Sequence, residues 1–202
     1  MMQSPDGHTR PSLFSYVVDH DLGFAPNPYD GFCTLVHCKF GGTGGPKNIV
    51  ELAEEQDWVL GSGGQSKQSA GNGNLVYLMR VDEKLPFAEY LADSRFRHRS
   101  DCVDYGNGNL SALVSWTYFY FGRNALPLSA LPDSLKVFTL LKKGIGFRRD
   151  LPAEAVGELA AWFSKHYEVG MHGDPCASQS TSIQPRKHRT AHCVRLRSEA
   201  DG

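Results

Sequence analysis

The sequence predicts an α+β protein with a small, strongly curved, mainly antiparallel sheet and flanking helices. Hydrophobic residues make up 41% of the 202 residues and aromatic residues 11%, which is enough to bury a core. The chain has 21 glycines and 11 prolines, which indicates many turns and short elements rather than a helical bundle. Apolar runs of strand length come mostly before the one long amphipathic segment, so strands and helices are segregated along the chain.

The first part of the chain predicts two strands joined by a loop. Residues 1–12 are polar and are expected to form a disordered leader. A β-branched and aromatic run predicts the first strand over residues 13–18. Residues 19–31 contain two closely spaced prolines, and because proline removes a backbone donor they are expected to form a loop. The second strand is expected over residues 32–39.

The middle of the chain predicts two short helices and two strands. A helix is expected over residues 48–55, followed by a strand over 57–61 that ends in a glycine loop at 61–67. Residues 74–82 are the clearest strand, with a continuous apolar run. Pro86 suits the first turn of a further helix, because its missing N–H group would be unpaired there in any case.

The last part of the ordered chain predicts a loop, a strand and two helices. Residues 98–110 are polar and rich in Gly and Asn, which favours a long loop. Residues 112–122 form an unusually aromatic strand, and residues 132–141 a short helix. The best helix spans residues 152–167, and Asp150 is its expected cap. Its apolar stripe at helical spacing consists of Val156, Leu159, Ala160 and Phe163.

These elements predict a single domain over residues 13–175, followed by a basic flexible tail over residues 176–202. The tail carries five basic and two acidic side chains and has only three large aliphatic residues. So few aliphatic side chains cannot offset the entropy of ordering the segment. Deletion of residues 178–202 is therefore expected to leave the melting temperature almost unchanged.

Charge and cysteine usage narrow the class of protein. The 21 basic and 22 acidic residues nearly cancel, which excludes a uniformly basic nucleic-acid-binding coat but not a local basic patch. The five cysteines are odd in number and contain no C-x-x-C pair, and residues 1–10 lack the apolar core of a signal peptide. No apolar stretch approaches the roughly 20 residues of a membrane helix. The sequence thus predicts a cytoplasmic protein with reduced thiols and no membrane partner.

Two segments carry candidate catalytic residues. In the triplet Asp19-His20-Asp21, alternation along an extended chain lets only Asp19 and Asp21 converge, as a general base and its partner or simply as polar caps of a turn. Cys33 and His37 share a face of the second predicted strand, whereas Cys38 points to the other. This spacing supplies no closed tetrahedral zinc set, so no metal or other cofactor is expected. Cys33 is either a buried strand thiol or a nucleophile.

The glycine loop and the aromatic strand are candidate nucleotide-binding elements. The loop's glycines would let backbone N–H groups approach an anion or a planar ring, although Lys67 is followed by Gln68 and the loop is not a Walker motif. The alternative is a plain connection between two strands. On the aromatic strand, Trp116, Tyr118 and Tyr120 share one face, which is either a stacking surface for a base or core.

Several spaced blocks together resemble the second nucleotide-modification-associated domain family. The blocks are YVVDHDLGFAPNP at 16–28, CTLVHCK at 33–39, DWVLGSG at 57–63, LVYLMRV at 75–81, Phe87-x2-Tyr90-x2-Asp93-x2-Phe96, YFYFG at 118–122 and Gly170-x-His172-Gly173-Asp174-Pro175. They cover about residues 13–175. Two features depart from the family pattern: Gln56 stands where a glycine usually precedes the Asp-Trp pair, and the basic tail lies outside the domain.

The resemblance implies a bacterial or phage domain that is associated with nucleotide or DNA-base modification, without implying an established reaction. The Asp57-Trp58 strand and the strand after it are also similar to those of PUA-like and EVE-like pseudo-barrels, which often hold a base in an aromatic pocket. We therefore expect a domain that recognises or processes a nucleobase or nucleotide in DNA modification or phage defence. A base would lie between the Pro26-Asn27-Pro28 loop, the glycine loop and the aromatic strand.

The expected nucleotide-binding residues are Asn27, Trp58, Gly61, Ser62, Gly63, Lys67, Tyr118, Tyr120 and His172, and the candidate catalytic residues are Asp19, Asp21, Cys33 and His37. Two alternatives stay open: an enzyme acting on a free nucleotide with an Asp base or Cys nucleophile, and a protein-interaction module of a modification complex. The expected partners are a nucleotide or modified DNA base, nucleic acid, and partner proteins of a modification system.

Overall fold

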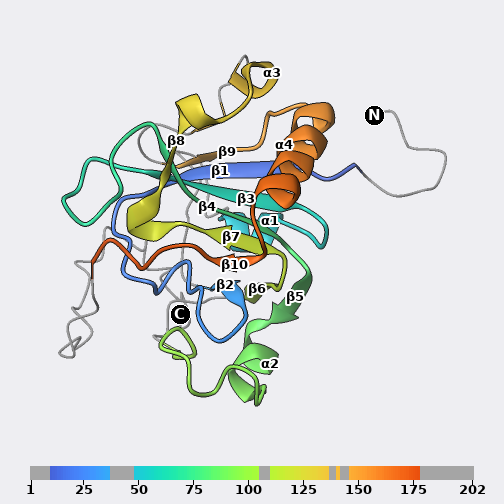
Figure 1. Ribbon diagram of the computed structural model, residues 1–202. Coiled ribbons are helices and arrows are strands. Elements are labelled where there is room, and N and C mark those ends of the chain that lie inside the picture. Colours follow the sequence, from blue (N-terminus) through green and yellow to red (C-terminus); the bar gives the residue numbers. More distant parts are fainter. Residues whose placement is uncertain (1–9, 37–47, 105–109, 137–139, 142–145, 178–202) are drawn as a thin grey trace, which may run out of the picture.

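The computed structural model describes residues 10–36, 48–104, 110–136, 140–141 and 146–177. Within these residues the larger of two sheets has seven strands, six of them in the order β10-β7-β4-β3-β1-β9, while β8 pairs with β4 (Figure 1). The strands are β1 (Leu13–Val18), β3 (Trp58–Gly63), β4 (Asn74–Arg80), β7 (Tyr118–Tyr120), β8 (Leu126–Pro127), β9 (Phe147–Arg148) and β10 (Gly170–Met171).

A smaller three-stranded sheet has the order β2-β6-β5. It consists of β2 (Cys33–Leu35), β5 (Glu83–Pro86) and β6 (Ser111–Ser115), all antiparallel. In the larger sheet β1 runs parallel to β3, and β10 runs parallel to β7, whereas the other pairs are antiparallel. Across the described residues neither sheet closes into a barrel. The predicted α+β class is confirmed.

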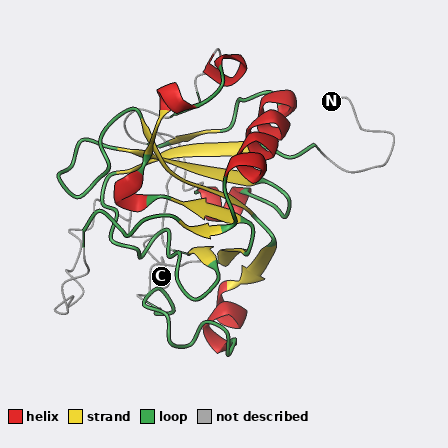
Figure 2. Cartoon of the chain, viewed as in Figure 1, coloured by secondary structure: helices red, strands yellow, loops and turns green. Residues whose placement is uncertain are grey.

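Within the described residues, four short or medium α-helices flank the sheets (Figure 2): α1 (Ile49–Leu52), α2 (Phe87–Ala92), α3 (Asp133–Lys136) and α4 (Ala153–His166). Two 3-10 turns span Gly122–Asn124 and Leu128–Ala130. The long predicted helix is confirmed, but its predicted cap is wrong. Pro152 occupies the cap position, and the carboxylate of Asp150 instead accepts a hydrogen bond of 2.6 Å from Arg148 Nε.

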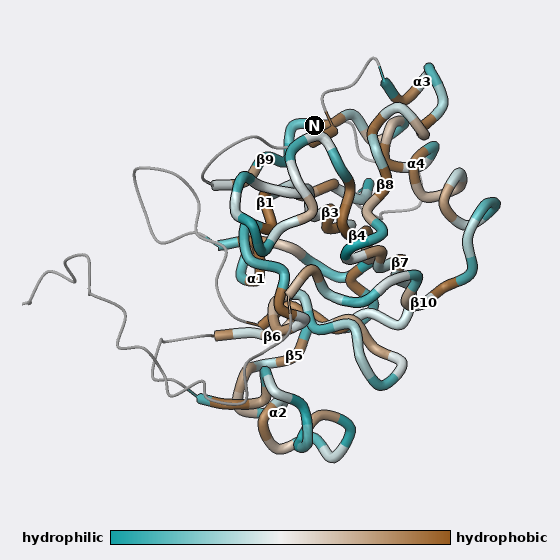
Figure 3. The backbone as a smooth tube through the Cα atoms, turned by 60° about the vertical axis from the view of Figure 1, so that its left-hand side comes forward, coloured by the Kyte–Doolittle hydropathy of each residue, from teal (hydrophilic) through white to brown (hydrophobic). Residues whose placement is uncertain are grey.

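The two faces of the larger sheet bury different cores because side chains alternate along its strands. One face, with Leu60, Leu78 and Phe119, packs against Leu159 and Phe163 of α4. The other face packs against α1 and the smaller sheet. The smaller sheet is covered on its outer side by α2. In Figure 3 the brown parts of the central strands β1 and β3 mark hydrophobic residues.

The predicted aromatic strand over residues 112–122 is wrong in one respect, because it is divided between the two sheets. β6 ends at Ser115 and β7 begins at Tyr118. Asp82 makes the break: its Oδ2 accepts hydrogen bonds from the backbone N–H groups of Trp116 and Thr117, at 2.8 and 2.7 Å. A turn whose amides are paired this way lets one chain segment cross from the smaller sheet to the larger.

Other predicted elements keep their type but are shorter than expected. The helix expected over residues 48–55 ends at Leu52, with Asn48 accepting a hydrogen bond from Glu51 N at 2.9 Å as its cap. The strand expected over residues 32–39 ends at Leu35, and residues 37–47 lie outside the described part of the chain. Within the residues described, no helix has the length and apolarity needed to cross a membrane.

Candidate functional site

The loop after β1 is held in place by a buried polar network. Arg99 is buried and donates to the carbonyl oxygens of Tyr29 and Asn27, at 2.5 and 2.8 Å, and to Thr34 Oγ1 at 3.0 Å. Asp101 lies 3.6 Å from Arg99 Nε and accepts from Asn27 Nδ2 at 2.9 Å and from the Thr34 hydroxyl. Removing one member of such a buried pair leaves an uncompensated charge, which is strongly destabilising. The loop is therefore held in the position in which Arg99 and Asp101 both keep their partners.

The same loop carries a buried carboxylate, Asp21, which is only 1% exposed. Its Oδ1 accepts from the Tyr120 hydroxyl at 2.5 Å and its Oδ2 from the Cys176 N–H at 3.1 Å. The Asp21 carbonyl accepts from Ala177 N at 3.0 Å. Asp21 thus joins three segments far apart in the sequence: the loop after β1, strand β7 and the chain after β10.

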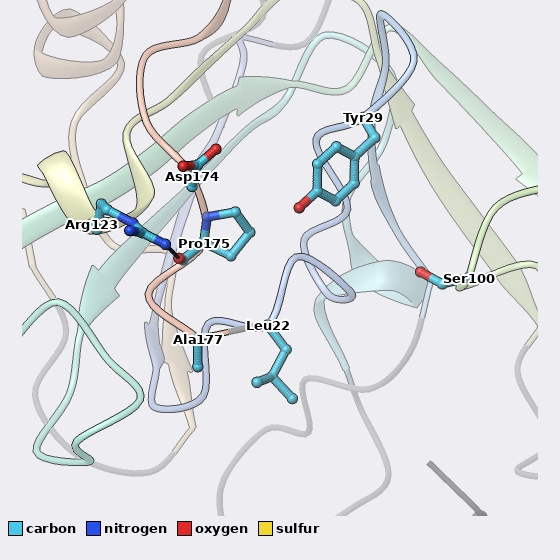
Figure 4. A pocket seen from close by; sticks show the side chains of 7 residues that line it. All are labelled: Leu22, Tyr29, Ser100, Arg123, Asp174, Pro175 and Ala177. Atoms are coloured by element: carbon cyan, nitrogen blue, oxygen red, sulfur yellow. Dashed lines mark hydrogen bonds between the residues drawn. The ribbon is translucent and has the colours of Figure 1, made fainter. Parts of the chain in front are cut away.

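A cavity of about 390 Å³ lies where these segments meet (Figure 4). It is lined by Leu22, Tyr29, Ser100, Arg123, Asp174, Pro175 and Ala177. Tyr29 is 41% exposed, and Figure 4 shows its ring across the cavity from Pro175. Arg123 donates from Nη2 to the carbonyl of Pro175 at 3.2 Å. The cavity therefore combines an aromatic ring, a guanidinium and a carboxylate.

Gly23 sets how closely the cavity walls approach each other. Its φ is +66°, and a Cβ built there would lie 2.7 Å from Pro175 Cγ and 3.0 Å from the Tyr29 ring. A side chain at this position would be strained in the backbone and would push both walls. This glycine therefore lets Tyr29 and Pro175 face the same cavity.

The glycine loop does not line the cavity, and three of its backbone N–H groups already have acceptors within the chain. Asp19 Oδ1 accepts from the N–H groups of Gln65 and Ser66, both at 3.1 Å, and the Ser69 hydroxyl accepts from Gly64 N at 2.7 Å. A Cβ on Gly64 would lie 2.3 Å from the Asp19 carboxylate. The anion that this loop holds is the chain's own side chain.

The predicted binding residues Gly61, Ser62 and Gly63 pack against other parts of the chain. A Cβ on Gly61 would lie 2.3 Å from the Tyr77 ring, and one on Gly63 would lie 2.1 Å from the Gly71 carbonyl oxygen. The Ser62 hydroxyl donates to the Tyr16 carbonyl at 3.1 Å. Lys67 is exposed. The glycines are present because backbone and aromatic rings pass close by.

A cluster of tyrosines lies between the two sheets, beneath Asp21. The Tyr77 hydroxyl donates to Tyr16 Oη at 2.9 Å. Burial raises the pKa of Tyr16, Tyr77 and Tyr120 well above the usual value, and for Tyr120 the Asp21 carboxylate raises the pKa further. These phenols stay protonated in the folded chain.

Cys33 belongs to the same buried core, and desolvation raises the pKa of its thiol far above its ordinary value. Burial and the Asp21 carboxylate also raise the pKa of Cys176, to about 12. A thiol with a raised pKa is a weak nucleophile at neutral pH. His37 lies outside the described residues. Across the part of the chain that the structure describes, no three His, Cys, Asp or Glu side chains are grouped as metal ligands.

The structure brings some of the expected nucleotide-binding residues together and separates others. Asn27, Tyr118 and Tyr120 meet at the loop after β1, where the Tyr118 hydroxyl donates to the Pro28 carbonyl at 2.9 Å. Trp58 lies on the α4 face of the larger sheet. The His172 ring stacks on Phe121 of the same core, with 5.0 Å between ring centroids, although its backbone N–H donates to the Tyr120 carbonyl. Of the predicted aromatic strand, β7 is buried on both faces, whereas Trp116 in the turn before it is exposed.

None of the seven residues that line the cavity is among the site residues predicted from the sequence. The three of them with aromatic or charged side chains are Tyr29, Arg123 and Asp174. Tyr29 directly follows the Pro-Asn-Pro turn, so the sequence places an aromatic residue in a loop. That position could have indicated a binding residue. Asp174 belongs to one of the blocks that carry the family resemblance. Arg123 gave no signal, since only the turn Gly122–Asn124 brings it against the chain at Pro175.

The fold and the cavity define a small α+β domain that carries a ligand-sized pocket formed by loops. A family model described as nucleotide modification associated domain 2 matches residues 10–109 and 100–182, and the chain belongs to this family. The chain thus has a role in nucleotide modification systems. No curated protein and no solved structure matches it.

Proposed function

We propose that the chain recognises a nucleotide, or a base of DNA, in the cavity beside Tyr29. One observation carries the proposal: an exposed aromatic ring, a guanidinium and a carboxylate surround one cavity of about 390 Å³ in a member of this family. Small-molecule pockets commonly have volumes of roughly 300–1,000 Å³, so this one suits a single nucleotide.

The groups around the cavity match the parts of a nucleotide. Stacking of a base on an aromatic ring is worth about 1–3 kcal/mol, and Tyr29 offers such a ring. The guanidinium of Arg123 uses Nη2 on a carbonyl, and its remaining N–H groups suit a phosphate oxygen. A base in duplex DNA would have to be flipped out of the stack to enter.

The proposal keeps part of the pocket expected from the sequence. Tyr29, which directly follows the Pro26-Asn27-Pro28 segment, supplies one wall of the cavity. Tyr120 of the aromatic strand holds the same loop through its hydrogen bond to Asp21. The glycine loop is left outside the proposed pocket, since Asp19 already accepts its N–H groups.

We favour recognition of a nucleotide over a reaction in which Asp21 or Cys33 is the catalytic residue. Asp21 accepts two hydrogen bonds and is buried, and the Cys33 thiol is fully buried with a raised pKa. A general base or nucleophile has to reach the reacting atom. We therefore expect binding of nucleotides without turnover at these two residues.

The test is calorimetric titration of the full chain with normal and modified nucleoside monophosphates. Tyr29→Ala should weaken binding at least tenfold, since tenfold corresponds to about 1.4 kcal/mol, whereas Tyr29→Phe keeps the ring and should bind normally. Arg123→Met should weaken binding of nucleoside monophosphates but not of nucleosides. Trp116→Ala is the matched control, because Trp116 is 47% exposed and does not line the cavity.

The proposal is overturned if no nucleotide binds, or if Trp116→Ala weakens binding as much as Tyr29→Ala does. Turnover of a bound nucleotide that disappears in Asp21→Asn, with affinity unchanged, would make the chain an enzyme with an Asp base. That result would replace recognition by catalysis.

A further inference from the structure

The segment that carries Asp174 is fixed by its neighbours. His172 N donates to the Tyr120 carbonyl at 2.7 Å, and Arg123 N donates to the Asp174 carbonyl at 2.8 Å. Gly122 and Gly173 make this approach possible: a Cβ on Gly122 would lie 2.0 Å from the Asp174 carbonyl oxygen, and one on Gly173 would lie 2.2 Å from that of Phe121. The backbone of Asp174 is thus held at the cavity before any ligand arrives.

The side chain of Asp174, by contrast, is exposed and lines the cavity. Among the described residues, no hydrogen-bond donor or cation occupies its carboxylate. After burial, the charge of the same carboxylate also raises the pKa of Tyr29. Figure 4 shows Asp174 next to Pro175, on the wall that faces the Tyr29 ring. Two acceptor oxygens without a partner among the described residues thus share a cavity with the Tyr29 ring.

We propose that Asp174 makes the pocket selective for a base with a guanine-type edge. This inference rests on the proposed function of the pocket. An ionised carboxylate only accepts hydrogen bonds, and its two oxygens match two adjacent donors. Guanine presents such donors at N1–H and N2–H. Adenine and cytosine present one amino group beside a ring acceptor, and the N3–H of uracil or thymine lies between two carbonyl oxygens that the carboxylate repels.

The experiment compares dGMP, dIMP, dAMP and dTMP by calorimetric titration of the full chain, with GMP as a control for contacts to the ribose. dIMP lacks only the exocyclic amino group of dGMP, so it isolates one hydrogen bond. We expect dGMP to bind roughly tenfold to a hundredfold more tightly than dTMP, the range that a bidentate base contact supplies, with dIMP in between. Asp174→Asn should remove this preference without changing the melting temperature. Glu168→Gln is the matched control, an exposed acid on the same segment that does not line the cavity.

Three results would overturn the inference. If all four nucleotides bind equally and Asp174→Asn binds like the native chain, the selectivity fails while the proposed function stands. If GMP binds much more tightly than dGMP and Asp174→Asn removes that difference, the carboxylate holds the ribose diol and not the base. If no nucleotide binds, the selectivity and the proposed function fail together.

Discussion

The glycine loop and the loop that carries Tyr29 are both rich in turn residues, yet they differ in what their polar groups do. In the glycine loop, the N–H groups of Gln65 and Ser66 are accepted by Asp19, and Gly64 is needed to admit that carboxylate. At the cavity, the side chains of Tyr29 and Asp174 stay exposed while their backbones are held by hydrogen bonds. A ligand site needs polar groups that have no partner within the chain, and it needs a backbone that is held in place. The glycine content of a loop indicates neither of these two properties.

Asp19 and Asp21 repeat this contrast two residues apart. The Asp19 side chain is 51% exposed and orders an exposed loop, whereas Asp21 is 1% exposed and joins three segments under the cavity. The neighbouring residues in the sequence do not distinguish the two carboxylates. Their roles differ because the chain after β10 returns to Asp21 and the glycine loop folds over Asp19.

Alkaline pH should lower the free energy of unfolding more than any single substitution, because it ionises the tyrosine cluster between the two sheets. The folded-state pKa of Tyr16, Tyr77 and Tyr120 is raised above the usual 10.0, so the unfolded chain loses these protons first. Their contribution to stability is full below about pH 10 and is lost as the pH rises further, by about 1.4 kcal/mol per unit for each phenol. The phenolate ultraviolet absorbance of these residues should appear together with unfolding. All eight tyrosines ionising near pH 10 in a folded chain would contradict this.

Tyr120→Ala should cost about 3–5 kcal/mol of unfolding free energy, as truncation of a buried aromatic residue does. Tyr29→Ala removes the same ring from a partly exposed position and should cost about 1 kcal/mol or less. Urea unfolding of both variants measures the difference directly. Equal losses would mean that Tyr29 belongs to the core and is not a surface for a ligand.

Asp19→Ala should cost about 1 kcal/mol, since a half-exposed carboxylate contributes less than a buried one. The change frees two backbone N–H groups of the glycine loop, so inorganic phosphate should now raise the melting temperature. Asp19→Asn keeps an acceptor oxygen and serves as the control. If phosphate stabilises the native chain and Asp19→Ala equally, Asp19 is not the anion that fills this loop.

The smallest expected effect is at Gln56, which has a φ of +77°, a backbone conformation that glycine adopts readily. Left-handed backbone costs a side chain about 1–2 kcal/mol, partly offset by the extra unfolded-state entropy of glycine. Gln56→Gly should therefore raise the free energy of unfolding by about 0.5 kcal/mol, with Gln56→Ala unchanged. A lower melting temperature for Gln56→Gly would show that the Gln side chain has a role of its own.

The sequence by itself determined much of the local structure. Apolar runs predict β1, β3 and β4, because strands buried on both faces need continuous apolar side chains. The apolar stripe of α4 and the proline before α2 place both helices, and spaced blocks identify the family. These features depend on neighbours within a few residues, which a linear pattern records.

Only the tertiary structure decided where the site lies. Asp82 divides the aromatic strand between two sheets through contacts made 34 and 35 residues away. Arg99 holds a loop 70 residues earlier, and Asp21 meets Cys176 across 155 residues. The cavity is lined by residues from the loop after β1, from Ser100, from the turn at Arg123 and from the chain after β10. Its position follows from which polar groups the fold has already paired, and no local pattern records that pairing.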